Sequence, residues 1–363
     1  MNAAKHIVLV CSRLDLPGGT EKAVVSLAGL FAAQKLRVTV LVLDDAADSF
    51  YAIPGDVNVK YENLRFGICP EKNWLARKLD FFNGIRRLRK IWSELKPDVI
   101  IATDYPFVVA TVLSGGPKIA RCFSWEHHAY GWLKKSAWWE RLLRFAYPQL
   151  HGVVCVNKAE IKHYQSLCRK VIAIPNFVAT NTAKPATLDA KMILTVGWLI
   201  HRKGIDLLLP AAKKVLTKHP DWSWKIIGGG EKETEVKNFI TENRLEKNLL
   251  LQPPASDDLS PEYQQASIFV LPSRIEVFGL VLTEAMAHGL PCIALAKADG
   301  PASIIKHKED GLLVAEDASE LADAVLHLIE NKEKRQQYGQ KALQNVQRFS
   351  PDEIYKLWRE LLS

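Results

Sequence analysis

Short apolar runs alternate with amphipathic helical segments along most of the chain. An apolar run at residues 7–11 is followed by alanines and leucines at helical spacing over 21–34, and a second apolar run follows at 38–43. Strand-sized apolar runs that alternate with helices are typical of parallel sheets covered by helices on both faces. The pattern therefore predicts an α/β protein. In the first half of the chain the clearest strands are predicted at 7–11, 38–43, 99–102 and 153–156.

A polar stretch interrupts this alternation once. Residues 179–190 have the composition of a linker. The sequence thus predicts two Rossmann-like domains, at 1–178 and 191–345, that face each other across a cleft where ligands bind. We expect the segment 346–363 to form a C-terminal helix that packs back toward the first domain. The strands of the second domain are predicted at 192–196, 224–227, 248–252, 268–271, 291–294 and 312–314.

The composition indicates a cytoplasmic protein with reduced thiols. The six cysteines are scattered and form no Cys-x-x-Cys pair, which disfavours a disulfide framework or a zinc site. No apolar stretch approaches the roughly 18 residues of a membrane-spanning helix. The first residues also lack the pattern of a secretory signal.

Positive charge is concentrated in the first half of the chain. Residues 1–180 carry 25 lysines and arginines against 15 acidic residues, so that of the totals of 48 and 40 the remainder holds 23 against 25. The segments 81–92 and 132–145 combine such cations with tryptophan, phenylalanine and leucine, as helices that lie on anionic membranes do. We expect contact with the inner face of the plasma membrane, the alternative being two surface helices with solvated cations. Nucleic acid is disfavoured, because no recognition module is found.

The most informative pattern lies in the segment 273–291. It follows a predicted strand and opens a helix near Gly279. A glycine at the start of a helix lets a ligand approach the backbone, and the free amides there suit a phosphate. Glu276 precedes the helix and Glu284 lies inside it, more than one turn later, so the two are not an acid–base pair on one face. We expect them to hold different parts of one elongated ligand.

In this setting the two glutamates resemble the Glu-x7-Glu signature of the retaining family 4 glycosyltransferases. That family has the GT-B fold of two Rossmann-like domains and is common in bacterial lipopolysaccharide, O-antigen and capsule synthesis. The resemblance implies that Glu284 binds the ribose of a nucleotide-sugar donor and that Glu276 is a catalytic residue facing the donor sugar. It also implies that the backbone at Phe278, Gly279 and Leu280 contacts the sugar and the diphosphate.

A second element, at residues 196–206, joins the first strand of the second domain to its first helix. Gly197, Arg202 and Lys203 lie in this loop, and cations beside a glycine at a helix start can clamp a diphosphate. The resembling family usually has an arginine where Trp198 stands here, so we expect Arg202 to substitute for it. The alternative is a solvated basic loop.

Two weaker patterns follow further along. The glycines 228–230 come after a predicted strand and resemble the family's glycine turn; Gly229 is the residue expected to contact the donor, although a plain turn is equally compatible. The segment 298–301 resembles a loop near the donor in some members that transfer hexoses.

The first domain offers a glycine loop and a histidine pair. Gly18 and Gly19 enter the first helix but do not form GxGxxG, which disfavours a dinucleotide-dependent dehydrogenase. By the resemblance this loop lies against the donor diphosphate and the acceptor. His127 matches the family's active-site histidine, and His128 is the alternative. No carboxylate of this domain has a clear claim to be a general base.

The resemblance therefore implies a retaining enzyme that moves a hexose or N-acetylhexosamine from a UDP-sugar to a lipid-linked, lipopolysaccharide or polysaccharide acceptor. No Asp-x-Asp pair is present to bridge a diphosphate through a metal, so we expect neither metal nor other cofactor, with cations and helix dipoles stabilising the leaving group. UDP is favoured because similar enzymes often use it. The alternatives are a UDP-sugar epimerase and a non-catalytic sugar-nucleotide-binding protein of the same fold, the latter favoured by Trp198.

Overall fold

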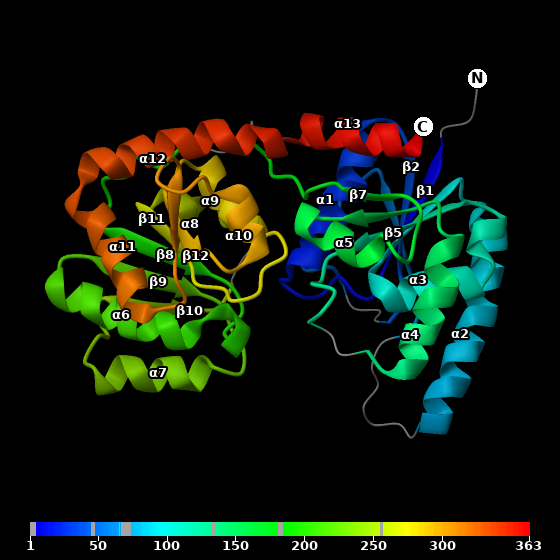
Figure 1. Cartoon of the computed structure of the whole chain (residues 1–363), viewed down its shortest axis with the longest axis horizontal. Helices are drawn as coiled ribbons and strands as arrows, with labels where there is room; N and C mark the ends of the chain where they lie inside the picture. The colour runs from blue at the N-terminus through cyan, green and yellow to red at the C-terminus, as the bar shows by residue number, and fades with distance from the viewer. Residues whose placement is uncertain are drawn as a thin grey trace. The chain divides into compact units, whose positions relative to one another are not determined.

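The computed structural model describes residues 5–44, 48–64, 66, 74–132, 135–180, 184–254 and 257–363, and for 74–78 the backbone alone. The chain forms two compact units. The first comprises Met1–Pro175 together with Tyr355–Ser363, and the second comprises Asn176–Ile354. The second unit thus includes the residues predicted as a linker. Each unit is a parallel sheet with helices on its faces, as predicted (Figure 1).

The first unit holds a seven-stranded parallel sheet in the order β3-β2-β1-β4-β5-β6-β7. Its strands are β1 (His6–Cys11), β2 (Arg37–Val42), β3 (Val57–Tyr61), β4 (Val99–Thr103), β5 (Arg121–Glu126), β6 (Gly152–Cys155) and β7 (Val171–Ala173). Its helices are α1 (Gly19–Ala33), α2 (Trp74–Leu95), α3 (Asp104–Leu113), α4 (Ala137–Ala146) and α5 (Ile161–Tyr164).

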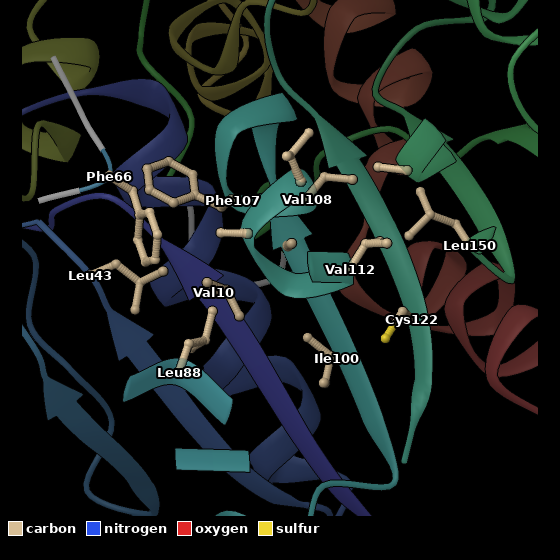
Figure 2. Packing of buried hydrophobic residues seen from close by; sticks show 14 of the residues in the cluster. Val10, Leu43, Phe66, Leu88, Ile100, Phe107, Val108, Val112, Cys122 and Leu150 are labelled. Carbon is tan, nitrogen blue, oxygen red and sulfur yellow. The ribbon is translucent and has the colours of Figure 1, made fainter. Parts of the chain in front are cut away.

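The core of this unit forms where helices cover the central strands. Val10 of β1 and Ile100 of β4 are fully buried and pack with Leu88 of α2 and Phe107 of α3 (Figure 2). Trp92 of α2 is also buried, and its indole N–H donates to the Ser114 hydroxyl (2.8 Å). Burial on both faces explains why β1 and β4 are continuous apolar runs that sequence alone could locate.

The C-terminal residues complete the first unit. Trp358, in α13 (Pro351–Leu362), packs edge-on against Phe31 of α1 and Trp125 of β5, with ring centroids 5.8 Å and 5.6 Å apart. The Arg121 guanidinium donates to the carbonyls of Leu361 (3.0 Å) and Leu362 (2.9 Å). A cation at the last carbonyls of a helix satisfies free acceptors and complements the helix dipole.

The second unit repeats the architecture with six parallel strands in the order β10-β9-β8-β11-β12-β13. The strands are β8 (Met192–Val196), β9 (Ser223–Ile227), β10 (Leu249–Gln252), β11 (Ile268–Leu271), β12 (Cys292–Leu295) and β13 (Gly311–Val314). The helices are α6 (Ile205–Lys218), α7 (Glu233–Glu242), α8 (Ser260–Gln264), α9 (Leu280–Ala287), α10 (Asp299–Ile304), α11 (Ala318–Glu330) and α12 (Lys332–Asn345).

Each sheet reverses its strand order at one place, between β1 and β4 in the first unit and between β8 and β11 in the second. Open α/β sheets bind ligands beyond the carboxyl ends of the strands at such a switch point. These two edges are therefore where the predicted site residues should gather.

The described cysteines are not paired in disulfides. The described cysteines, Cys11, Cys122, Cys155, Cys168 and Cys292, are buried free thiols, and Cys69 lies outside the described residues. None of the helices within the described ranges is long and apolar enough to span a membrane.

Candidate functional site

Two predicted donor ligands meet at the switch point of the second sheet. Lys203 ends the short 3-10 turn η4 (His201–Lys203) in the loop after β8, and Glu276 lies in the loop after β11. The Lys203 ammonium donates to Glu276 Oε2 at 2.5 Å. Each side chain is 17% exposed. This edge therefore presents a pre-positioned cation and carboxylate that are still open to a ligand.

Arg274 ties the two loops together. Its guanidinium donates to both carboxylate oxygens of Asp206 (2.7 Å each), at the start of α6, and to the His201 carbonyl (3.0 Å). It also pairs with Glu316 after β13. Hydrogen bonds from Arg274 lower the pKa of the Asp206 carboxyl. The sequence analysis did not single out Arg274, because an arginine next to a glutamate motif gives no signal of its partners.

Glycine is required where these loops pass close to other backbone. Gly204 has a φ of +71°, and a Cβ there would stand 2.0 Å from the Pro272 carbonyl oxygen. A Cβ on Gly228 would stand 1.9 Å from the carbonyl oxygen of Gly197. In the glycine turn after β9, close packing thus demands Gly228 more than the predicted Gly229, whose carbonyl accepts from the Leu199 amide (2.8 Å).

The second half of the glutamate motif forms the start of α9. Gly279 caps the helix, Leu280 is its first residue, and Phe278 before it is buried with its ring 5.3 Å from that of Phe349. Glu284 is largely buried inside the helix and accepts from the Tyr263 hydroxyl (2.9 Å).

Two further segments that the sequence analysis considered flank this motif. The Gly300 amide donates to the Glu276 carbonyl (2.8 Å), which brings the weakly predicted segment 298–301 against the motif. The Arg202 carbonyl accepts from the Arg274 amide (2.8 Å), and the Nε atom of the Arg202 guanidinium is buried. The family usually has an arginine at the position of Trp198, and the expectation that Arg202 takes over its role stays a prediction.

In the first unit, the predicted glycine loop follows β1 and the predicted histidines follow β5, the strands on either side of β4. Gly18 caps α1 beyond β1, and Gly19 is the first helical residue. A Cβ on Gly18 would stand 2.1 Å from Glu21 Oε2, so the Glu21 carboxylate lies directly against this glycine. His127 and His128 follow β5.

The two histidines differ in their surroundings. The His127 ring packs on Trp125 with centroids 4.2 Å apart. Burial lowers its pKa to about 4, so it is neutral at pH 7. Its Nε2 is buried and has no hydrogen-bond partner within the part of the chain that the structure describes. His128 Nδ1 lies 2.9 Å from Asp104 Oδ1, and its side chain is 38% exposed.

Two carboxylates that the sequence analysis did not select lie beside this pair. Asp104 is the first residue of α3, and its Oδ1 also accepts from the His127 amide (3.4 Å). Glu126, at the end of β5, accepts from the hydroxyls of Ser124, Tyr147 and Tyr164. Burial raises the pKa of Glu126 to about 7. Among the described residues, no cluster of three His, Cys, Asp or Glu side chains could hold a metal ion.

Comparison with known proteins agrees with this architecture. Residues 17–182 match the sequence profile of Glycosyltransferase Family 4, and residues 179–345 match that of the Glycosyl transferases group 1. The two profiles together span residues 17–345, and the chain belongs to the GT-B glycosyltransferases of family 4 and group 1. It is thus a transferase, and the resemblance on which the sequence analysis relied is confirmed.

Two relatives illustrate the family. This glycosyltransferase is 29% identical over 370 residues to an uncharacterized glycosyltransferase of Haemophilus influenzae, covering 99% of this chain and 100% of the relative. It is 25% identical over 374 residues to the amylovoran biosynthesis glycosyltransferase AmsD of Erwinia amylovora, covering 98% and 99%.

Solved structures share the fold. A crystal structure of Staphylococcus aureus TarM, a variant in complex with fondaparinux, alpha-GlcNAc-glycerol and UDP, aligns with a TM-score of 0.81 at 15% identity. The alignment covers 99% of this chain and 100% of TarM. The GT-B fold is therefore confirmed.

The Arg274 contacts give a first prediction for this glycosyltransferase. Lysine cannot reproduce the two-pronged bond to Asp206, so Arg274→Lys should loosen both loops and lower kcat/KM for the donor about 10-fold, mainly through KM. Steady-state kinetics measure this. The control is Lys297→Met, which removes the other cation on Glu316 (3.1 Å) and should leave KM unchanged. An unchanged donor KM in Arg274→Lys would contradict the assignment.

Proposed function

We propose that this enzyme transfers a hexose or N-acetylhexosamine, with retention, from a UDP-sugar to a lipid-linked, lipopolysaccharide or polysaccharide acceptor. Neither a metal nor another cofactor takes part. The observation that carries the proposal is the Lys203–Glu276 pair at the switch point of the second sheet.

The pair gives the donor two complementary contacts. A diphosphate competes with Glu276 for the Lys203 ammonium, because both are anionic and within reach of the same cation. Once Lys203 binds the diphosphate, the Glu276 carboxylate is released to face the sugar. Glu284, held by Tyr263 (2.9 Å), then binds the ribose hydroxyls.

Backbone amides assist Lys203 with the leaving group. The start of α9 at Gly279 and Leu280 presents amides that have no partner within the helix, at the positive end of the helix dipole. Cations and amides fixed in advance are the means by which a protein stabilises a developing phosphate charge without a metal.

The relatives support the donor and acceptor classes. TarM binds UDP in its crystal structure, and AmsD is named for the biosynthesis of a polysaccharide. The experiment is a transfer screen of UDP-glucose, UDP-galactose and UDP-N-acetylglucosamine, with GDP-mannose and ADP-glucose for comparison. The acceptors are undecaprenyl-diphosphate-linked N-acetylglucosamine and rough lipopolysaccharide.

The proposal predicts transfer from a UDP-sugar without added metal, and NMR of the product should show the anomeric configuration of the donor. Inversion at the anomeric carbon would overturn the retaining mechanism. Conversion of one UDP-sugar into another in the absence of an acceptor would instead favour the alternative function of a UDP-sugar epimerase.

We further propose that α2 and α4 dock the enzyme on the cytoplasmic face of an anionic membrane. Of the seven large hydrophobic side chains that are exposed in the described part of the chain, five lie on or beside these helices. We define the aromatic–basic face as these five residues together with four exposed arginines of α2 and α4. Its members are Leu79, Phe82, Arg86, Arg89, Trp132, Trp138, Arg141, Arg144 and Phe145.

The two helices bring these residues together. Phe81 of α2 and Trp138 of α4 have ring centroids 5.9 Å apart, and the helices lie side by side in Figure 1. Within α4, Trp138, Arg141 and Phe145 recur at helical spacing and therefore share one face. Exposed aromatics interleaved with arginines suit the headgroup region of an anionic bilayer.

The double variant Phe82→Glu, Trp138→Glu should bind phosphatidylglycerol vesicles about 10- to 100-fold more weakly than wild type, because it loses two apolar anchors and gains two anionic groups. Vesicle sedimentation measures the effect. The control is Ile119→Glu, Leu357→Glu, which alters two exposed apolar residues that lie outside α2 and α4 and should bind normally. Equal loss in both variants, or no wild-type binding, would overturn the membrane proposal.

A further inference from the structure

A second polar centre lies at the switch point of the first sheet. Asp104 directly follows β4, His128 follows the neighbouring β5, and Glu21 lies in the first turn of α1, which comes after β1. Strands β1, β4 and β5 are adjacent in the sheet. The side chains of one helix start and two strand ends therefore converge at this edge.

Asp104 is held in a strained backbone conformation. Its φ is +57°, a left-handed value, at the first residue of α3. Only glycine adopts such values freely, although aspartate and asparagine tolerate them better than other residues. Strain of this kind persists where the surrounding structure enforces it, and it clusters at functional sites. Here it directs a carboxylate that is 16% exposed toward the histidine loop.

The Asp104 carboxylate fixes that loop at two points. It accepts from the His127 amide (3.4 Å) and lies 2.9 Å from His128 Nδ1. Burial alone would raise the pKa of the Asp104 carboxyl, but its interaction with the His128 ring lowers that pKa. An ionised carboxylate can only accept, so His128 Nδ1 carries a proton, and in the neutral ring Nε2 is then the acceptor nitrogen.

The charges at this edge favour the acceptor, rather than the donor diphosphate, as the ligand of the predicted Gly18–Gly19 loop. Glu21 and Asp104 place carboxylates in the first turns of α1 and α3, the positions where a helix would otherwise favour an anionic ligand. The nearby cations are engaged: Arg13 pairs with Asp15, and the Lys135 amine donates to the Tyr130 carbonyl (2.9 Å). A neutral ligand that donates hydrogen bonds, such as a sugar hydroxyl, fits these groups.

We propose that His128 binds the attacking hydroxyl of the acceptor and that Asp104 is the positioning residue that orients His128 for this contact. The inference rests on the proposed function and names the residues that contact and orient its acceptor. His128 accepts the hydrogen bond from the hydroxyl, and Asp104 acts through His128. The predicted glycine loop, with Glu21 against Gly18, then borders the acceptor.

The test compares sugar transfer with hydrolysis of the donor by water. The variants are Asp104→Asn, His128→Gln and their combination, assayed with the UDP-sugar and acceptor that the wild type uses in the transfer screen, and with the same UDP-sugar alone. Asparagine tolerates the left-handed backbone, so Asp104→Asn should fold. The matched control is Lys96→Asn, another left-handed residue of this unit (φ +45°) that is exposed.

Each single variant should lower kcat/KM for the acceptor about 30-fold and leave acceptor-free hydrolysis within about threefold. Because Asp104 acts through His128, the double variant should lose no more than either single one. Lys96→Asn should match wild type. Transfer and hydrolysis falling together, additive losses, or unchanged transfer would overturn the inference. A wild type without any transfer would count against the proposed function instead.

Discussion

Glu276→Gln should lower the transfer rate about 100- to 1,000-fold, the size of effect produced by removing one fixed electrostatic contact from an active site. UDP binding should stay within about threefold of wild type. The two effects separate because the amide removes the negative charge that competes for Lys203, so the ammonium stays available to the diphosphate. Steady-state kinetics and calorimetry with UDP measure both.

A matched control exists in the same unit. Lys225 and Glu262 form another partly buried pair, at 2.7 Å, between β9 and α8. Glu262→Gln should therefore leave transfer unchanged. If Glu276→Gln retained normal turnover, or lost activity only in step with its melting temperature, Glu276 would not be a catalytic residue.

Lys203→Met should weaken UDP binding about 10- to 100-fold, because a charge-assisted contact to the diphosphate is lost. It also leaves Glu276, now without this cation, to repel the diphosphate. Calorimetry measures the affinity, and Lys225→Met is the control. Equal UDP affinity in Lys203→Met would refute the diphosphate assignment, whereas tighter binding in Lys203→Met, Glu276→Gln than in Lys203→Met alone would support it.

The sequence predicted the parts of the fold that are buried on both faces. The runs at 7–11 and 99–102 became β1 and β4, and the runs at 192–196 and 268–271 became β8 and β11. These are the four strands beside the two switch points, so their prediction placed the site loops as well. The strand β5 was not predicted, because Arg121, Ser124 and Glu126 interrupt its apolar pattern.

The contacts of single side chains were beyond sequence reasoning. The spacing of Glu276 and Glu284 is visible in the chain, but the partner of Glu276 lies 73 positions away at Lys203. Asp104 gave no signal, because its distinction is a backbone angle and a contact to His128. Arg274 likewise acquires its role only when α6 and the loop after β13 fold against it.

The return of the chain to the first unit has a consequence for biosynthesis. Phe31 and Trp125 contact Trp358, and Arg121 contacts the carbonyls of Leu361 and Leu362, so these partners come from residues that are translated after the second unit. Domains usually fold in order as they leave the ribosome. Here the first unit lacks its contacts with Trp358 until the second unit has been translated, so the nascent chain exposes the hydrophobic surface beside Phe31 and Trp125 throughout translation of the second unit.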